Sequence, residues 1–509
     1  MRRIISVMCA VALCVMLTAC TATPSGTPSA DPTAPTTDTQ IVDGVMRLVF
    51  NREDTLNPYT TKTATNLYLS TLLYQSLFTP DKNFAAKAVL ADTASMTDPT
   101  HLSVTLKAGV LFSDGAVCGA RDVQYSFQKA KNSANYSAAL ANFTAVAVKG
   151  ETLTFTLSVP DAYATACLYF PIVKRDTGDA ALPTGCGNYT YDAENEMLKA
   201  RGKSRYQTVQ LCHYTDGSAM LQGVQNGSIS YLYDDLSDGN IPRTSAKQTA
   251  VDLPQLVFLG INHARGVLGN ATVRAALSAA IDRTAIASSS YAGRAHAATS
   301  PFPPTWQPAQ TVAVASATVT RGAADLMKKA LAGAVVTSTA PSQTAQTGAP
   351  TTAATTAATI AQTTAAWTLI YPAGGACREA AVKNLVKQFA LVGVTLTPVP
   401  LDYAAYTARL AAGDFDLYLG EIRLTPNMSL TPFLTAGGST AYGINIAGDT
   451  AQKYMALRRG EIDMTAFAVA FTADMPYIPI CWRQGIAMSD AAVTNMTPTA
   501  YAVYDGMIS

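Results

Sequence analysis

Residues 106–115 read LKAGVLFSDG and residues 120–126 read ARDVQYS, and together they form the clearest structural pattern in the chain. Alternating apolar residues directly before the first segment predict a strand, and glycine-containing turns follow it. A helix is expected to begin at the second segment, with Asp122 in its first turn, where a carboxylate interacts favourably with the helix dipole. We therefore assign Asp114 and Asp122 to turn formation and helix capping rather than to a binding site.

Short strands and helices alternate along the rest of the chain, which is typical of an α/β or α+β protein. Strands are expected at residues 45–50, 101–106, 152–159, 256–262, 367–370, 394–399 and 475–480, and helices at residues 66–78, at 120–130, from 270–272 onward and at 379–392. We divide the chain into a first lobe (residues 41–255), a second lobe (residues 256–475) and a return to the first lobe (residues 476–509). An Ala/Thr-rich insertion within the second lobe, residues 311–366, is expected to be disordered.

The N-terminus has the parts of an export signal, because two arginines precede an apolar run that ends in small residues. LTAC at residues 17–20 resembles a bacterial lipobox, in which Cys20 carries lipid and becomes the new N-terminus. An ordinary cleaved signal with a chance cysteine is the alternative. The Thr- and Pro-rich residues 21–40 cannot bury enough apolar surface to fold and predict a tether. A lipoprotein signal peptide over residues 1–20 would place the protein outside the cytoplasmic membrane, held by lipid alone.

Composition limits the classes of partner. The 509 residues are 49% hydrophobic and 14% charged with a net charge of +1, so nothing indicates nucleic acid binding. Beyond Cys20, the cysteines form an even set suited to disulfides in an oxidising compartment: Cys118, Cys167, Cys186, Cys212, Cys377 and Cys481. We favour pairing of Cys167 with Cys186, which are close in sequence, and leave the other connectivities open. No metal site is expected, because there is no CxxC and the four histidines are scattered.

Four stretches resemble the oligopeptide/dipeptide/nickel-binding family (family 5) of extracellular solute-binding proteins. They are residues 56–59 with 73–78, residues 106–126, residues 270–283, and residues 413–417 with 476–480. The resemblance implies an α/β, two-lobed periplasmic-binding-protein-like fold (type II, similar to cluster C) with a hinge between the lobes. It also implies a monomeric receptor that binds di- or oligopeptides in the interlobe cleft for the permease subunits of an ABC importer, with no cofactor and no catalysis.

The resemblance also indicates the residues that touch the ligand. In this family a carboxylate after the GDFD motif pairs with the α-ammonium of the peptide, and Glu421 stands where the family has aspartate. A surface glutamate at a strand end is the alternative. Arg423 would face the same side of the strand and either bind a ligand carboxylate or neutralise Glu421, the role that we favour. Further candidates for the cleft, each as often an ordinary structural residue, are Asn51, Arg52, Asp54, Tyr442, Asn445 and Trp482.

Other functions remain open at this point. They are a receptor for a nickel chelate or another small solute, a sensory receptor without transport, and a secreted hydrolase. The sequence contains no GxSxG elbow, no HExxH helix and no P-loop, which argues against an enzyme. Scarce histidine argues mildly against direct metal ligation, and the expected amine-binding carboxylate argues mildly for peptides.

Overall fold

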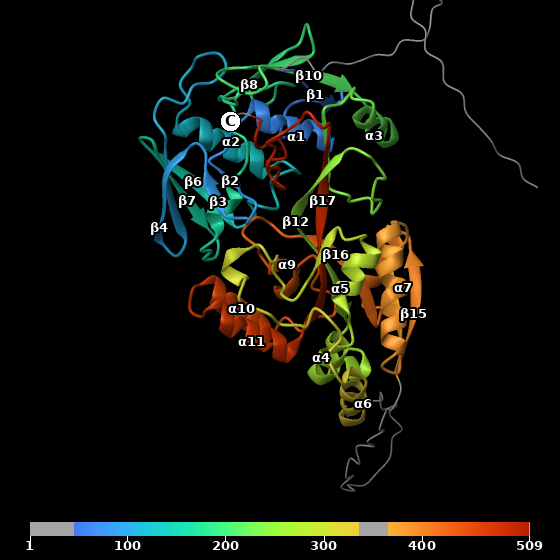
Figure 1. Cartoon of the computed structure of the whole chain (residues 1–509). Coiled ribbons are helices and arrows are strands. Elements are labelled where there is room, and N and C mark those ends of the chain that lie inside the picture. Colours follow the sequence, from blue (N-terminus) through green and yellow to red (C-terminus); the bar gives the residue numbers. More distant parts are fainter. Residues whose placement is uncertain (1–44, 335–364, 508–509) are drawn as a thin grey trace, which may run out of the picture. The chain divides into compact units, whose positions relative to one another are not determined.

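The computed structural model describes residues 45–334 and 365–507, which form two large apolar cores and one smaller apolar cluster. We call the segments around the first core (residues 45–246 and 490–507) lobe 1, and those around the second (residues 262–334 and 365–476) lobe 2. Each lobe combines helices with strands, so the expected two-lobed α/β fold is confirmed (Figure 1).

Two long antiparallel strands, β12 (Lys247–Ile261) and β17 (Tyr477–Ser489), run from one lobe to the other. β17 also pairs with β11 of lobe 1 and β12 with β16 of lobe 2, so one eleven-stranded sheet extends through both lobes. The β12–β17 register shifts between Asp252 and Leu256, and again between Val257 and Phe258. Such irregularities bend strands, and a pair of crossing strands is where a hinge between lobes acts.

The lobe 2 half of β12 is buried on both faces, and two glycines allow its aromatic neighbours to fit. Gly260 lies opposite Tyr418, and Gly420 lies opposite Phe258. Each ring occupies the space that a β-carbon on the facing glycine would need. The two rings meet edge to face with their centroids 5.6 Å apart. Packing, rather than a turn, therefore requires glycine at these positions.

Lobe 1 contains the remaining strands of its half of the large sheet, a four-stranded antiparallel sheet and a hairpin. The large-sheet strands are β1 (Val45–Phe50), β8 (Tyr189–Asp192), β9 (Met197–Ala200), β10 (Thr208–His213) and β11 (Tyr231–Asp234). The smaller sheet has β4 (Ala91–Asp98), β5 (His101–Leu106), β6 (Phe143–Lys149) and β7 (Thr152–Leu157), and the hairpin has β2 (Phe78–Pro80) and β3 (Ala86–Ala88). The helices are α1 (Ala64–Leu73), α2 (Ala120–Lys131) and α3 (Gly217–Gln225), with a 3-10 turn at Ala164–Cys167.

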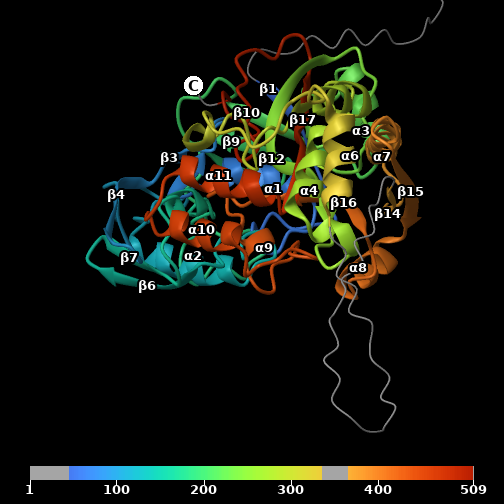
Figure 2. The ribbon, with the colours of Figure 1, turned by 90° about the horizontal axis from the view of Figure 1, so that it is seen from below.

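Lobe 2 places most of its helices around its half of the sheet, with α10 beside α11 and α4 beside α6 (Figures 1 and 2). Its strands are β14 (Ala365–Pro372), β15 (Val394–Leu401) and β16 (Leu417–Arg423), and β13 (Ala295–Ala297) lies against β17. Its helices are α4 (Ala271–Ala279), α5 (Arg283–Ala285), α6 (Ala323–Gly333), α7 (Ala376–Ala390), α8 (Tyr403–Ala411), α9 (Thr431–Leu434), α10 (Asp449–Arg458) and α11 (Met464–Asp474).

Most of the predicted elements are confirmed, and two need correction. Helix α1 ends at Leu73 because Tyr74 is extended, so Leu77 reaches the core from outside the helix. The strand predicted at residues 475–480 begins at Tyr477 and runs on to Ser489 as β17, which is paired on both sides. Pro479 is tolerated there because it lies opposite Phe258, at the register shift.

The acidic residues of the opening pattern have the structural roles predicted for them. Asp114 Oδ1 accepts a hydrogen bond from the backbone of Ala116, and its other oxygen pairs with Lys174. Asp122 accepts the backbone N–H of Gly119 at the start of α2, and that of Arg175. Both carboxylates are therefore occupied within lobe 1.

The predicted insertion and disulfide also need correction. Helix α6 lies within the insertion predicted at residues 311–366 and buries Met327 and Leu331. The N-terminal part of that segment is therefore folded and belongs to lobe 2. Like the other four cysteines of the described chain, Cys167 and Cys186 are free thiols, and these two are buried. Each belongs to the lobe 1 core as an apolar side chain.

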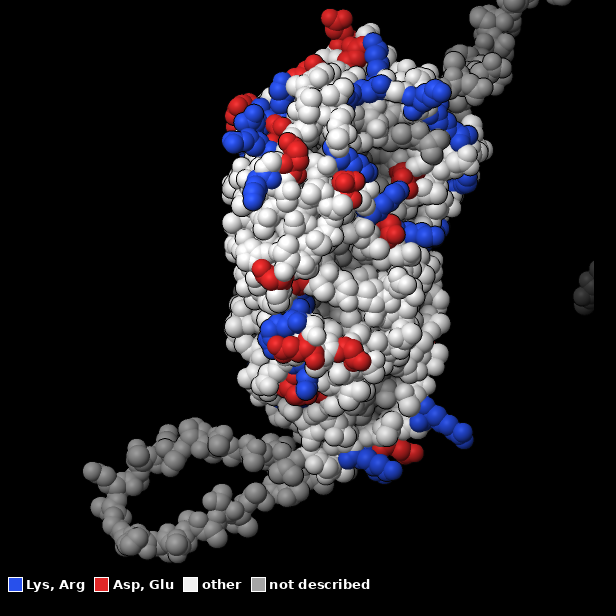
Figure 3. Space-filling model, turned by 90° about the vertical axis from the view of Figure 1, so that its left-hand side faces the viewer, with Lys and Arg blue, Asp and Glu red and all other residues white. Residues whose placement is uncertain are grey.

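The predicted signal peptide, the tether, Cys20 and residues 335–364 of the insertion lie outside the described residues. In the described part of the chain, no helix has the length and apolar character needed to cross a membrane. On the face drawn in Figure 3, charged side chains stand in small groups of mixed sign, in keeping with the net charge of +1.

Candidate functional site

A cavity of about 600 Å³ lies where the two lobes meet beside helix α1. Lobe 1 contributes α1, the segments around Tyr136 and Tyr169, and residues 500–505 of the C-terminal segment. Lobe 2 contributes residues 423–426, which begin with the last residue of β16. Cavities of about 300–1,000 Å³ are usual for small-molecule sites, so this interlobe cavity is the candidate binding site.

Tyrosines form much of the cavity wall, namely Tyr68, Tyr74, Tyr136, Tyr169, Tyr501 and Tyr504. Tyr169 contacts Tyr136 and Tyr501, with ring centroids 5.6 and 5.1 Å apart. Burial raises the pKa of Tyr169 to about 12 and raises that of Tyr68 well above its ordinary value. The phenols therefore remain protonated and present apolar ring faces with neutral hydroxyl groups.

Arg423 and Asp235 bring opposite charges to this cavity from the two lobes. Arg423 ends β16, and Asp235 directly follows β11. Arg423 Nη1 lies 3.5 Å from Asp235 Oδ2, and Arg423 Nη2 lies 3.4 Å from the carbonyl oxygen of Ala500. The side chains are 40% and 22% accessible, and Tyr501 lies beneath the guanidinium at 6.0 Å. Both groups are loosely paired and have room for further hydrogen bonds.

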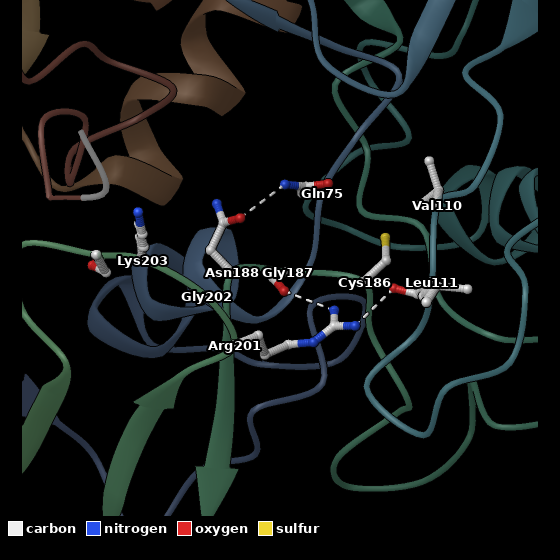
Figure 4. A pocket seen from close by; sticks show the side chains of 10 residues that line it. Gln75, Val110, Leu111, Cys186, Gly187, Asn188, Arg201, Gly202 and Lys203 are labelled. Carbon is white, nitrogen blue, oxygen red and sulfur yellow. Dashed lines mark hydrogen bonds between the residues drawn. The ribbon is translucent and has the colours of Figure 1, made fainter.

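A smaller pocket of about 340 Å³ shares Gln75 and Asn188 with the interlobe cavity. The Gln75 amide donates to Asn188 Oδ1 at 3.3 Å between the two pockets (Figure 4). Arg201 lines the smaller pocket, but its guanidinium already donates to the carbonyls of Gly187, Leu111 and Phe112. Its donors are directed at the protein backbone, so this pocket is a weaker candidate for an anion.

Glu421, the residue predicted to bind an amine, does not line the interlobe cavity. Its Oε2 accepts hydrogen bonds from Arg483 at 2.9 Å and Gln255 at 3.1 Å, and its Oε1 lies 3.4 Å from Arg378. Its side chain is 13% accessible. The ligand role of Glu421 stays a prediction, but two guanidinium groups already compensate its charge.

The favoured role of Arg423 as the partner of Glu421 is wrong in this structure. Arg483 and Arg378 neutralise Glu421, whereas Arg423 pairs with Asp235. Arg483 lies on β17 and Arg378 on α7, so the neighbours that reach Glu421 are distant in sequence. The open alternative, a free guanidinium for a ligand carboxylate, suits the loose contacts of Arg423.

Three predicted residues lie after β1, away from the wall of the interlobe cavity. The backbone N–H of Asn51 donates to Asn66. Arg52 forms an ion pair with Glu196 at the surface. Asp54 Oδ2 accepts hydrogen bonds from threonine hydroxyls and backbone N–H groups of residues 61–63, and it thereby fixes the loop before α1. Their ligand roles are untested predictions.

The other three predicted residues belong to lobe 2 and β17. Tyr442 packs against the lobe 2 core, and Asn445 accepts the backbone N–H of Ala447 in a turn. Trp482 is 1% accessible and donates its indole N–H to the carbonyl of Ser300. They also remain predictions, and they do not line the cavity.

Sequence reasoning missed most of the cavity wall. Asp235 and Tyr501 are contributed by segments that carry no recognised motif. The sequence YAVY at residues 501–504 places two tyrosines close together near the C-terminus. That aromatic pair was an available signal, but its position beside β16 depends on the return of the chain to lobe 1.

Comparison with known proteins identifies the family. The model of bacterial extracellular solute-binding proteins, family 5, matches residues 86–443, which is more than half of the chain. The chain belongs to this family. Its members are solute receptors rather than enzymes, and they act outside the cytoplasm.

Relatives are similar over part of the chain, and solved structures over most of it. The glutathione-binding protein GsiB of Salmonella choleraesuis is 26% identical over 290 residues, 50% of this chain and 56% of that protein. The match thus spans about half the length of this curated relative. A structure of the ABC transporter substrate binding protein CtaP from Listeria monocytogenes has a TM-score of 0.65 at 19% identity, covering 92% of this chain and 99% of that one. A nickel ABC transporter structure from Bacillus halodurans has a TM-score of 0.68 at 17% identity, covering 90% and 98%. At these identities the structures support the fold alone.

Proposed function

We propose that this chain is the solute receptor of an ABC importer and that it binds a short peptide, or a similar small zwitterion, in the interlobe cavity. The observation that carries the proposal is the pair Arg423 and Asp235, which face one cavity from opposite lobes with a contact of 3.5 Å. Membership of an extracellular solute-binding family supports the receptor role. The two charges favour a solute that carries both a carboxylate and an ammonium group.

Each charged group suits one end of such a solute. A guanidinium binds a carboxylate through two parallel hydrogen bonds, and Arg423 has donors without close partners. Asp235 Oδ1 accepts the backbone N–H of Ser237, and among the described residues its Oδ2 has only the long contact to Arg423. An ammonium group could therefore bind at Asp235, while the tyrosine rings cover the apolar part of the solute. Closure of the lobes excludes water and strengthens both contacts.

Asp235 is thus a second candidate for the amine-binding role that the sequence assigns to Glu421. Asp235 lines the cavity, whereas Glu421 is held by two arginines beyond its wall. Substitution of each carboxylate by its amide distinguishes the two hypotheses.

Native mass spectrometry of the protein purified from cells tests the proposal first. Closed receptors often retain their solute, so mild denaturation should release short peptides or another zwitterion. A nickel chelate would keep the receptor role and contradict peptide binding, whereas a solute without a carboxylate would keep the receptor role and contradict the role of Arg423. A protein that is empty, and whose melting temperature does not change with mixed di- and tripeptides, would contradict peptide binding.

We also propose that lipid on Cys20 holds the receptor at the membrane, with residues 21–40 as the tether. The support is the sequence LTAC after a short apolar run with two arginines at its start. Cys20→Ser should move the protein from the membrane fraction to the soluble extracytoplasmic fraction, as measured by fractionation. Metabolic labelling with a fatty acid is the control, because the wild type should take up the label. A Cys20→Ser protein that remains labelled and membrane-bound would contradict the tether.

A further inference from the structure

The lobes also meet through a buried ion pair that does not line the solute cavity. Asp161 follows β7 in lobe 1, and Arg458 ends α10 in lobe 2. Asp161 Oδ2 and Arg458 Nη2 are 2.6 Å apart, and the side chains are only 1% and 8% accessible. In both Figure 1 and Figure 2, β7 and α10 lie on the same side of the crossing strands β12 and β17. The ion pair can therefore act on lobe closure at a distance from the hinge.

Lobe 2 holds its half of this contact in a fixed geometry. Asn427 donates its amide to Asp161 Oδ2 at 2.6 Å. Arg458 Nη1 donates to Ser429 and to the Tyr454 hydroxyl, both at 3.0 Å. Burial raises the pKa of Asp161, and Arg458 and Asn427 oppose that rise. The backbone N–H of Tyr163, in lobe 1, donates to Asp161 Oδ1 at 3.0 Å. Closure must thus remove water from this carboxylate, and the lobe 2 partners supply the cationic compensation for the loss.

Aromatic packing accompanies the ion pair. Tyr163, two residues after Asp161, meets Trp306 of lobe 2 edge to face with centroids 4.9 Å apart. Tyr163 packs against the lobe 2 core, and Phe84, from the loop between β2 and β3, belongs to that core. Lobe 1 therefore packs two aromatic side chains against the lobe 2 core, and one of them, Tyr163, lies two residues from Asp161.

One short segment joins this contact to the solute cavity. Residues 423–426 line the cavity, and Asn427 binds Asp161. Thr425 lines the cavity and donates its hydroxyl to Asn427 Oδ1 at 2.6 Å. The cavity wall and the buried ion pair are thus adjacent along the chain, and both need the lobes in the same closed position.

We propose that Asp161, Asn427 and Arg458 form an interlobe latch that keeps the lobes closed without contacting the solute. The latch holds the closed conformation even in the solute-free protein. Its consequence for solute affinity rests on the proposed receptor function, because the apparent affinity scales with the closed fraction. Loss of either charge leaves the other buried and unpaired, which disfavours the closed conformation. The latch residues are therefore positioning residues for solute binding.

The test measures opening in solute-free, full-length protein, so that it does not depend on which solute is bound. Small-angle X-ray scattering gives the radius of gyration, and hydrogen exchange reports the loop around Phe84 and the segment before Trp306. Arg458→Met and Asp161→Asn should each increase the radius of gyration and accelerate exchange at both segments. Arg459→Met is the matched control, since Arg459 is the next residue and pairs with Glu461 at the surface. It should behave like the wild type.

The double variant Asp161→Asn/Arg458→Met separates a latch from misfolding. With both charges removed, no unpaired buried charge remains, so it should be less open than either single variant. Where solute is retained, each single variant should release it at least about tenfold faster than the wild type. A wild-type radius of gyration and wild-type exchange in both folded single variants would overturn the latch. Open single variants of a protein whose wild type also binds no solute would uphold the latch and contradict the receptor proposal instead.

Discussion

The protein joins its lobes through two ion pairs that differ in almost every physical respect. Arg423 and Asp235 approach to 3.5 Å with side chains 40% and 22% accessible. Asp161 and Arg458 approach to 2.6 Å with side chains 1% and 8% accessible. The first pair borders a cavity of about 600 Å³, and the second does not line that cavity and has the Tyr454 ring beside its guanidinium. A group that binds a solute must keep unused hydrogen-bonding capacity, whereas a structural contact uses it within the protein.

The difference also separates affinity from stability. A cavity-facing charge keeps some contact with water, so its removal leaves no buried charge behind. A fully buried pair depends on both partners, since each charge is desolvated in the closed protein. We therefore expect substitutions at the buried pair mainly to lower stability, and substitutions at the cavity pair mainly to weaken solute binding.

The largest effect is expected at the buried pair. Arg458→Met should lower the free energy of unfolding by up to about 3–5 kcal/mol, because the closed conformation leaves Asp161 buried without a cationic partner and opening of the lobes relieves only part of that cost. Arg423→Met should change it by less than about 1 kcal/mol. Urea unfolding followed by circular dichroism measures both. Equal losses for the two variants would remove the distinction between the pairs.

The next effect concerns solute binding. Arg423→Met should weaken binding of the co-purified solute by more than about tenfold, since a charge-assisted hydrogen bond contributes about 1.5–3 kcal/mol. Isothermal titration calorimetry gives the dissociation constant. Arg459→Met again serves as the control, because it removes the same charge at an exposed position. An unchanged dissociation constant for Arg423→Met would remove Arg423 from the site.

Two carboxylates compete for the solute amine, and parallel substitutions distinguish them. Asp235→Asn should weaken binding of a free-amine peptide by about tenfold, while an N-acetylated peptide should be affected little. The hypothesis from the sequence expects the same selective loss, well over tenfold, for Glu421→Gln. Retained affinity in Glu421→Gln, with lower thermal stability, would instead assign Glu421 to its contacts with Arg483 and Arg378.

Local patterns predicted the elements well. The alternation before the opening segment gave β5, and the residues after it gave α2 with its capping Asp122. These signals are contained within a few residues, so no distant contact is needed to read them. The helix predicted over residues 66–78 is too long at its C-terminal end. Leu77 packs into the core from the segment after α1, which ends at Leu73.

The site was predicted less well because its parts come from distant segments. Arg423 and Asp235 are 188 residues apart in sequence, and neither shows by itself which lobe or cavity it faces. Glu421 has the position that the family pattern indicates, but Arg378 and Arg483 reach it from α7 and β17. A pattern of residue types gives a carboxylate, and only the fold shows whether its charge is already compensated.

The smallest effect is expected at a third ion pair, which joins β13 to the crossing strand β12. His296 on β13 lies 2.9 Å from Asp252 on β12, and both also contact Gln484 on β17. The hydrogen bond to Asp252 raises the pKa of His296 despite partial burial. A raised pKa means that the contact stabilises the fold below the unfolded value of about 6.5 and loses that effect as pH rises through the folded value.

His296→Gln should therefore destabilise the protein by less than about 1 kcal/mol near pH 6, because the imidazole is 44% accessible and solvent screens the pair. The difference from the wild type should disappear at alkaline pH. Melting temperatures of both proteins between pH 5.5 and 9 measure it, at low and high salt, and high salt should reduce the acidic difference. A difference that grows with pH would mean that the neutral imidazole holds the three strands together. The accessible fraction of the paired side chains would then not predict how much each of the three ion pairs contributes to stability.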